Sequence, residues 1–374
     1  MTPSNSNDYL APTLTVVPFD KDNPDHKDLR PYSYSILNAM NQCPRWGTIH
    51  YGLKKTYTAN ARAMALEYGS ILHEVIASFR LWHLGSKYMK LPQHQAFHAV
   101  RLFGKARWDT AIAASNEYDD GFDQITVLGV NILSSGDFYD DDSDSMRTFS
   151  NAEECIITAA RDYLRNAEDN PIWVEDVNDP TKRVGIEITF DLVVSVTGAE
   201  GFGDMLPDHT RRARFIGTID GVHESVRDGI IPHEFKTAAR PSDSWRDSFR
   251  TGHQVTGYNV AISTVLNMEL MNTRVKGVKS KQTGHVEDFR SFLERRDHEA
   301  VYTWAHWFFD AVDQYERFVL DWRRAPMYTH SCNRYFRTCS LMPFCTATPA
   351  DQNLQLEDMV DTAPSPSEAA VLSR

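Results

Sequence analysis

Two carboxylates and a lysine lie on neighbouring segments that have the alternating pattern of β-strands. Asp220 ends one apolar segment, and Glu234 and Lys236 belong to the next. Residues i and i+2 of a strand share a face, so Glu234 and Lys236 point the same way, and a hairpin would let Asp220 join them. Two carboxylates beside a lysine suit a hard divalent cation and an attacking water. An exposed Glu/Lys pair also fits this pattern, but charges inside an apolar strand favour a functional site.

Two further polar motifs flank these strands in the sequence. His73 ends the motif Gly69-x3-His73 on a predicted helix, where its apolar neighbours would equally suit a histidine of the core. Gln254 and Tyr258 are four residues apart and therefore share one face of a later predicted helix.

In this order, Gly-x3-His, Gly-x2-Asp, Glu-x-Lys and Gln-x3-Tyr resemble the RecB-type branch of the PD-(D/E)XK nuclease superfamily. That branch includes the RecB and AddB nuclease domains, the CRISPR-adaptation exonucleases and many bacteriophage exonucleases. The sequence departs from the family name at one position, because Ile219 rather than proline precedes Asp220.

The resemblance implies a role for each matching residue. His73, Asp220 and Glu234 would bind Mg²⁺ or Mn²⁺, with the carbonyl oxygen of Phe235 as a further ligand. Lys236 would assist the attacking water. The two remaining catalytic candidates, Gln254 and Tyr258, would contact the DNA backbone or support the site.

The chain has five unevenly distributed cysteines, and an odd number in a chain of this size does not indicate a disulfide scaffold. Cys332, Cys339 and Cys345 lie close together in the sequence, and Cys43 is the obvious fourth member of a set, whereas Cys155 is expected to be an isolated buried cysteine. Four thiolates suit an iron–sulfur cluster or tetrahedral zinc, and unrelated buried thiols are the alternative. An early cysteine followed by a late trio resembles the iron–sulfur members of the same nuclease branch. The resemblance implies a [4Fe–4S] cluster that ties the two ends of the domain together, with zinc as the less favoured occupant.

The pattern of strands and helices that must position these residues predicts an α/β fold. The resemblance implies a restriction-endonuclease-like mixed central sheet of four to six strands, flanked by helices and carrying a helical insertion. The expected strands are 184–196, 213–222, 229–237 and 273–277, and the expected helices are 33–43, 61–82, 92–115, 152–167, 248–268 and 297–324. We expect a flexible arm over 1–28, a single nuclease domain over 29–348 and a disordered tail over 349–374. Within the domain, a helical and acidic insertion would cover about 92–180, and the catalytic core about 184–280.

Charge gives conflicting signals about a nucleic-acid partner. The chain has 39 Lys and Arg against 51 Asp and Glu, a net charge of −12, which opposes non-specific binding to phosphate. Much of the acidic excess lies in residues 116–150, which are expected to form a solvated loop. Basic residues near the motifs are candidates for DNA contacts, or for ordinary solvated surface: Arg214, Arg240, Arg246, Arg250 and Lys279. Trp245, Phe249 and Tyr258 could stack on unpaired bases or belong to the core.

Together these features predict a metal-dependent DNA exonuclease that leaves 5′-phosphate products and acts in recombination, repair or phage DNA metabolism. The alternatives are a non-catalytic iron–sulfur DNA-binding accessory protein of recombination, or a CRISPR-adaptation nuclease that trims DNA ends. The expected partner is a single-stranded or frayed DNA end, and a recombination or replication protein and a homo-oligomer are both compatible with the sequence. No apolar run is long enough for a membrane span and the first residues lack a signal peptide, which predicts a cytoplasmic location (the host cytoplasm, if the protein is phage-encoded).

Overall fold

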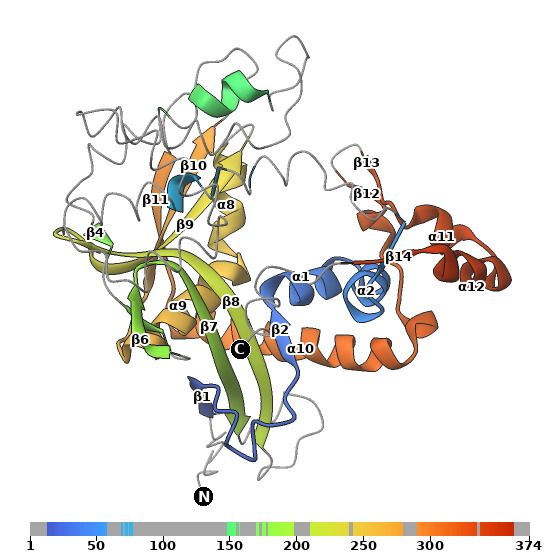
Figure 1. Cartoon of the computed structure of the whole chain (residues 1–374), viewed down its shortest axis with the longest axis horizontal. Helices are drawn as coiled ribbons and strands as arrows, with labels where there is room; N and C mark the ends of the chain where they lie inside the picture. Colours follow the sequence, from blue (N-terminus) through green and yellow to red (C-terminus); the bar gives the residue numbers. More distant parts are fainter. Residues whose placement is uncertain are drawn as a thin grey trace, which may run out of the picture. The chain divides into compact units, whose positions relative to one another are not determined.

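The computed structural model describes residues 13–57, 69, 72–73, 75–77, 148–154, 157, 170–171, 174–176, 179–197, 210–238, 242–279, 290–334 and 337–362 (Figure 1). The chain divides into two compact units. Unit 1 comprises Met1–Ala59, Phe190–Gly217 and His298–Arg374, and unit 2 comprises Asn60–Thr189 and Thr218–Asp297. The range 29–348, predicted as one domain, is thus shared between two units, and the strands β7 (Ile186–Thr197) and β8 (Thr210–Ser225) contribute residues to both.

The predicted α/β class is confirmed, with a mixed and mostly antiparallel sheet. In unit 2, β8 pairs antiparallel with β9 (Gly229–Ala238), β9 pairs parallel with β10 (Asn272–Lys279), and β10 pairs antiparallel with β11 (Arg290–Arg295). The predicted turn between β8 and β9 is present, and Gly229 adopts a φ of 70° there, a conformation that favours glycine. Among its described residues, unit 2 also contains the short strand β4 (Asn170–Pro171), which pairs with β8, and the hairpin of β5 (Val174–Asp176) with β6 (Asp179–Val184).

Two helices of unit 2 replace the single helix predicted over 248–268. They are α8 (Asp243–Arg250) and α9 (His253–Leu266), and the break falls at Thr251 and Gly252. Ser242 caps α8 by accepting a hydrogen bond from the amide of Trp245, and Asn267 ends α9 in the left-handed conformation. α9 contacts both β9 and β10, so it lies against the strand that carries Glu234 and Lys236.

Unit 1 is built around a long aromatic helix, α10 (His298–Leu320), close to the predicted 297–324. Trp304 and Phe308 of α10 pack against Phe215 of β8, at ring-centroid distances of 5.6 and 5.5 Å. Gly217, which opens the Gly-x2-Asp motif, has a packing role here, because a Cβ atom at this position would lie 2.4 Å from Cζ of Phe190. The remaining elements of unit 1 are β1 (Thr13–Pro18), β2 (Pro31–Ser33), α1 (Tyr34–Gln42), α2 (Pro44–Gly47), the π-helical turn η1 (Thr48–Gly52), β3 (Lys55–Thr56), the 3₁₀ turns η2 (Trp322–Arg324) and η3 (Thr329–Ser331), β12 (Asn333–Arg334), β13 (Arg337–Thr338), α11 (Met342–Thr346), α12 (Pro349–Asp358) and β14 (Val360–Asp361).

The described residues near both ends of the chain, 13–28 and 349–362, contain strands and a helix that composition did not predict. In place of a loose arm over 1–28, β1 pairs antiparallel with residues 192–197 of β7, because its alternating Leu14 and Val16 side chains are partly buried. In place of a disordered tail from 349, α12 and β14 follow Cys345, and β14 pairs with β3. These partners are distant in sequence, so the local polar composition gave no sign of them.

Several expectations fall on residues outside the described ranges, namely the helix 92–115, nearly all of the acidic stretch 116–150, Cys155 and Arg240. Positions 69, 72–73 and 75–77 of the predicted helix 61–82 are helical. In the part of the chain that the structure describes, no helix combines the length and the apolar character needed to span a bilayer.

Candidate active site

Three side chains of unit 2 converge closely enough to share a metal ion. Nitrogen or oxygen ligand atoms of His73, Glu187 and Asp220 all lie within 4.8 Å of one another. His73 Nδ1 is 3.5 Å from Asp220 Oδ1, and the other Asp220 oxygen accepts a hydrogen bond of 2.6 Å from the amide of Phe235. The structure therefore brings together two predicted ligands from a helix and a strand that are far apart in sequence.

Glu187 was missed by the sequence analysis. It is the second residue of β7 and adopts a φ of 50°, which is uncommon for a residue other than glycine. Strained backbone of this kind persists where the surroundings fix it, and it clusters at functional sites. One signal was available, because Glu187 interrupts the apolar run of β7 just as Glu234 interrupts that of β9.

Glu234 and Lys236 share one face of β9, as predicted, and their side chains form an ion pair. Glu234 is only 1% exposed, whereas the Lys236 side chain is 31% exposed. Apart from this ion pair, neither carboxylate oxygen of Glu234 has a hydrogen-bond partner among the residues that the structure describes. A buried carboxylate with so few donors is costly unless a cation compensates its charge.

The charged groups strongly perturb one another. Burial and the nearby Asp220 carboxylate raise the pKa of Glu234 to about 7. Burial opposes the charged forms of Asp220 and His73, but their mutual attraction outweighs it, so the pKa of Asp220 is lowered and that of His73 is raised. Lys236 and the Phe235 amide also favour the ionised form of Asp220. A divalent cation among these groups would favour the ionised forms of both carboxyls.

Gln254 and Tyr258 are brought to the same site by α9. The Gln254 side-chain amide donates a hydrogen bond of 2.9 Å to the Tyr258 hydroxyl, which confirms their predicted common face. Burial raises the pKa of Tyr258 well above its usual value, and the Glu234 and Asp220 carboxylates add to the rise. The Tyr258 phenol therefore lies within electrostatic reach of both carboxylates.

The four cysteines of the predicted set line one cavity of unit 1, with a volume of about 250 Å³. Cys43 follows α1, Cys332 follows η3, and the Cys339 amide donates a 2.7 Å hydrogen bond to the Cys332 carbonyl. Burial raises the pKa of Cys345 to about 11, and the other three cysteines add to the rise. Unlike the ligand atoms around Asp220, no three of these sulfur atoms, all in the described part of the chain, lie within 4.8 Å of one another.

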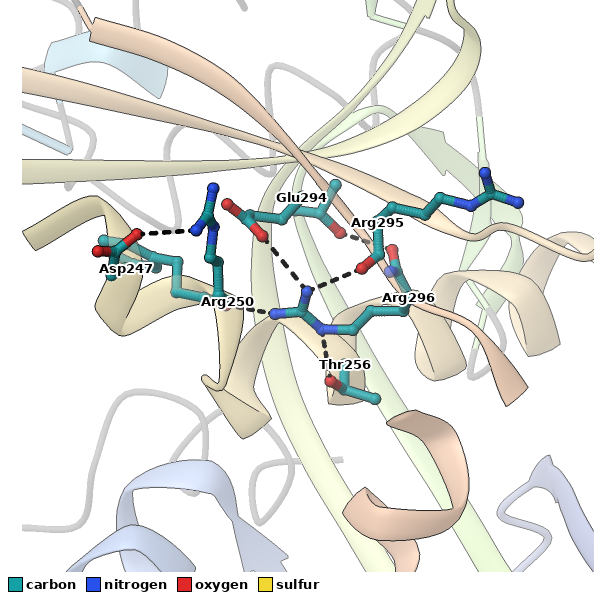
Figure 2. A network of polar contacts seen from close by, with 9 residues as sticks. Asp247, Arg250, Thr256, Glu294, Arg295 and Arg296 are labelled. Atoms are coloured by element: carbon teal, nitrogen blue, oxygen red, sulfur yellow. Dashed lines mark hydrogen bonds and ion pairs between the residues drawn. The ribbon is translucent and has the colours of Figure 1, made fainter. Parts of the chain in front are cut away.

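The predicted DNA-contacting residues differ in their surroundings. Arg214 makes two hydrogen bonds, of 2.7 and 2.6 Å, to the buried Asp191 carboxylate and lies against the Phe19 ring, so it is engaged inside unit 1 and its prediction gains no support. Arg246 and Arg250 are exposed on α8, where Arg250 pairs with Asp247 at 3.2 Å (Figure 2). The backbone of Lys279 ends β10.

The aromatic candidates for base stacking have packing roles. Trp245 and Phe249 of α8 contact each other and Phe292 of β11, with ring centroids 4.9 to 5.8 Å apart. This cluster packs α8 against the sheet, although the Trp245 and Phe249 side chains are only partly buried.

No protein-family model matches this chain, and no curated protein matches it significantly. The assignment of a function therefore depends on the geometry and chemistry of the site itself.

Proposed function

We propose that this protein is a metal-dependent DNA exonuclease of the PD-(D/E)XK type, which hydrolyses phosphodiester bonds and leaves 5′-phosphates. The observation that carries the proposal is the convergence of His73, Glu187 and Asp220, with the Glu234–Lys236 pair on the adjoining strand. The residues that match the resembling family in order and type are His73, Asp220, Glu234 and Lys236, and Glu187 adds a third carboxylate.

The donor set suits a hard divalent cation. Carboxylate oxygens with one imidazole nitrogen are ligands that Mg²⁺ and Mn²⁺ accept, and the buried Glu234 carboxylate has too few donors of its own. We assign His73, Glu187, Asp220 and Glu234 as the residues that would hold the ion, with the Phe235 carbonyl as a further candidate. When bound, Mg²⁺ or Mn²⁺ supplies Lewis-acid stabilisation of the charge that develops on the phosphate.

The protein's own side chains supply orientation and charge. The Lys236 ammonium is anchored by Glu234 but remains partly exposed, so it can donate a hydrogen bond to the attacking water and stabilise negative charge on the phosphate. Gln254 and Tyr258 form a fixed pair of polar groups beside the carboxylates, suited to hold a DNA phosphate in place.

We also propose that a [4Fe–4S] cluster binds at Cys43, Cys332, Cys339 and Cys345. All four thiols line one cavity of about 250 Å³, which supports a bound group that they share. Thiolates of this kind hold either an iron–sulfur cluster or tetrahedral zinc, and zinc is the less favoured occupant. Bound there, the cluster would link Cys43 to the C-terminal cysteines and so stabilise unit 1.

Digestion of end-labelled single- and double-stranded DNA tests the proposal. With Mg²⁺ or Mn²⁺ we expect progressive shortening and 5′-phosphate products, and with EDTA no cleavage. Asp220→Asn and Lys236→Met should lose activity, whereas Glu224→Gln, which changes an exposed carboxylate of the same strand, should keep it. Equal cleavage by wild type and Asp220→Asn, purified identically, would assign the activity to a contaminant and overturn the proposal.

A further inference from the structure

A buried arginine of unit 2 lies outside the metal-binding residues. Arg296 follows β11 directly and is 3% exposed, and its counterion, Glu294, is 5% exposed. The two side chains lie 3.5 Å apart, and Figure 2 shows the Arg296 guanidinium between Glu294 and Thr256. A buried ion pair adds little net stability, because desolvation offsets the attraction, so its value is often that it specifies one arrangement.

Arg296 uses its guanidinium to join three elements. Its Nε donates a hydrogen bond of 2.9 Å to the Thr256 hydroxyl of α9, and one terminal nitrogen donates to the carbonyl of Phe249 in α8. The other terminal nitrogen donates to the carbonyl of Arg295 in β11 at 3.0 Å. A planar fork of donors is needed to reach these acceptors together, and lysine lacks it.

Helix α8 is held by the Arg296 contact as well as by its aromatic side chains. None of its residues is buried, and its N-terminal half is held chiefly by Trp245, whose indole covers Gly277 of β10. Gly277 is the residue paired with Lys236 across the β9–β10 ladder. At the other end of α8, Arg296 binds a carbonyl of the last turn, where a cation also interacts favourably with the helix dipole.

Helix α9 meets the same guanidinium near its first turn. Its N-cap, Gly252, offers no side-chain hydrogen bond, and Thr256, the acceptor for Arg296, lies between Gln254 and Tyr258 in sequence. A cation near a helix N-terminus opposes the helix dipole. The position of Arg296 is therefore not explained by stabilisation of α9 alone. It is explained if Arg296 fixes the corner between α8 and α9.

We propose that Arg296 is a positioning residue for DNA binding, which holds the α8–α9 corner so that Gln254 and Tyr258 engage the same DNA strand as the exposed arginines of α8. The inference rests on the proposed nuclease function and deepens it. Those α8 arginines are Arg246 and Arg250. The metal-binding carboxylates and Lys236 lie on strands that Arg296 does not hold, so they should keep their geometry without it.

Steady-state cleavage of end-labelled DNA with saturating Mn²⁺ tests this inference. Arg296→Met should raise KM for DNA about tenfold with kcat changed less than about threefold, since mainly DNA binding is lost. Arg296→Lys should recover only part of the loss. A merely structural role would lower the active fraction, and hence the apparent kcat, with KM unchanged, and that result would overturn the proposal.

Arg274→Met provides the matched control. Arg274 is a part-buried arginine of β10 that pairs with Asp228 in the β8–β9 turn, away from the α8–α9 corner, so KM should not change. If Arg296→Met does not fold, Thr256→Val removes one acceptor with little change of volume, and a KM equal to wild type would then overturn the inference.

Fluorescence anisotropy of labelled DNA with Ca²⁺ separates the two proposals. If the wild type binds DNA but cleaves none with any metal, the nuclease proposal fails, and a tenfold weaker affinity of Arg296→Met would still support its positioning role. Equal affinities would refute that role, and a wild type that neither binds nor cleaves DNA would refute both.

Discussion

Replacing Glu234 by glutamine is expected to stabilise the metal-free protein and to abolish DNA cleavage. The Glu234 carboxyl is 1% exposed, and its burial beside Asp220 raises its pKa to about 7 from an ordinary 4.5. An acid whose pKa is raised by folding lowers stability once it ionises, because the unfolded state releases its proton more readily. Glutamine keeps the shape of the side chain and removes the charge.

The pKa difference sets the magnitude and the pH window of the effect. Below pH 4.5 the carboxyl is protonated in the folded and unfolded states, so it has no cost, and above pH 7 the cost is complete. At about 1.4 kcal/mol per pKa unit, the ionised carboxyl destabilises the metal-free fold by about 3 kcal/mol. Glu234→Gln should therefore gain up to about 3 kcal/mol at pH 8 and almost nothing at pH 4.5.

Thermal unfolding in EDTA, followed by circular dichroism from pH 4.5 to 8, measures this effect. At pH 8 the midpoint of Glu234→Gln should lie several degrees above that of wild type, and the difference should vanish in acid. Added Mn²⁺ should raise the wild-type midpoint more than that of the variant, because the ion binds the folded carboxylate.

Glu294→Gln is the matched control, because Glu294 is also a buried glutamate on a strand of unit 2. Its partner Arg296 is buried, so the substitution leaves an uncompensated cation and should destabilise the protein at pH 8. A Glu234→Gln protein that is less stable than wild type at pH 8 in EDTA would refute the reasoning. It would mean that the Glu234–Lys236 pair stabilises the fold and is not a strained metal site.

Three further predictions follow from particular contacts. Glu187→Gln should lower DNA cleavage by at least about a hundredfold while the melting temperature in EDTA is unchanged or higher, and full activity would remove Glu187 from the site. Gly277→Ala places a Cβ atom 2.4 Å from the Trp245 ring, so it should lower the free energy of unfolding in urea by about 1–3 kcal/mol and change tryptophan fluorescence. Unchanged stability and fluorescence would mean that Trp245 does not hold α8 against Gly277. Removal of residues 349–374 uncovers the apolar cluster against which Cys345 packs. Burial raises the pKa of the Cys345 thiol to about 11, so its exposure in metal-free protein should make it react about tenfold faster with a disulfide reagent. An unchanged rate would show that α12 and β14 do not shield it.

The strands that carry the site were predictable because their signals are local. Alternating apolar residues and the Asp228-Gly229 turn predicted the hairpin of β8 and β9, and the observed pairing confirms it. The ion pair of Glu234 with Lys236 confirms their common face, and the Gln254–Tyr258 hydrogen bond confirms helical spacing.

The remaining features depend on partners that are distant in sequence. Glu187 joins Asp220 only through the tertiary arrangement of the β7 and β8 strands, and nothing in the spacing of the two residues indicates it. The corner between α8 and α9 is bridged by Arg296, which lies about 40 residues beyond them in the sequence. Likewise, β14 is ordered by pairing with β3, some 300 residues earlier in the chain.

Cleavage by the metal-loaded protein shows whether the carboxylate cluster of unit 2 is a nuclease centre. The decisive quantity is the rate at which the wild-type protein shortens 5′-end-labelled DNA with Mn²⁺, compared with Asp220→Asn prepared in the same way. We expect steady shortening by wild type and at least about a thousandfold slower shortening by the variant, with both proteins equally folded. Equal rates, or no cleavage by wild type with either Mg²⁺ or Mn²⁺, would contradict it.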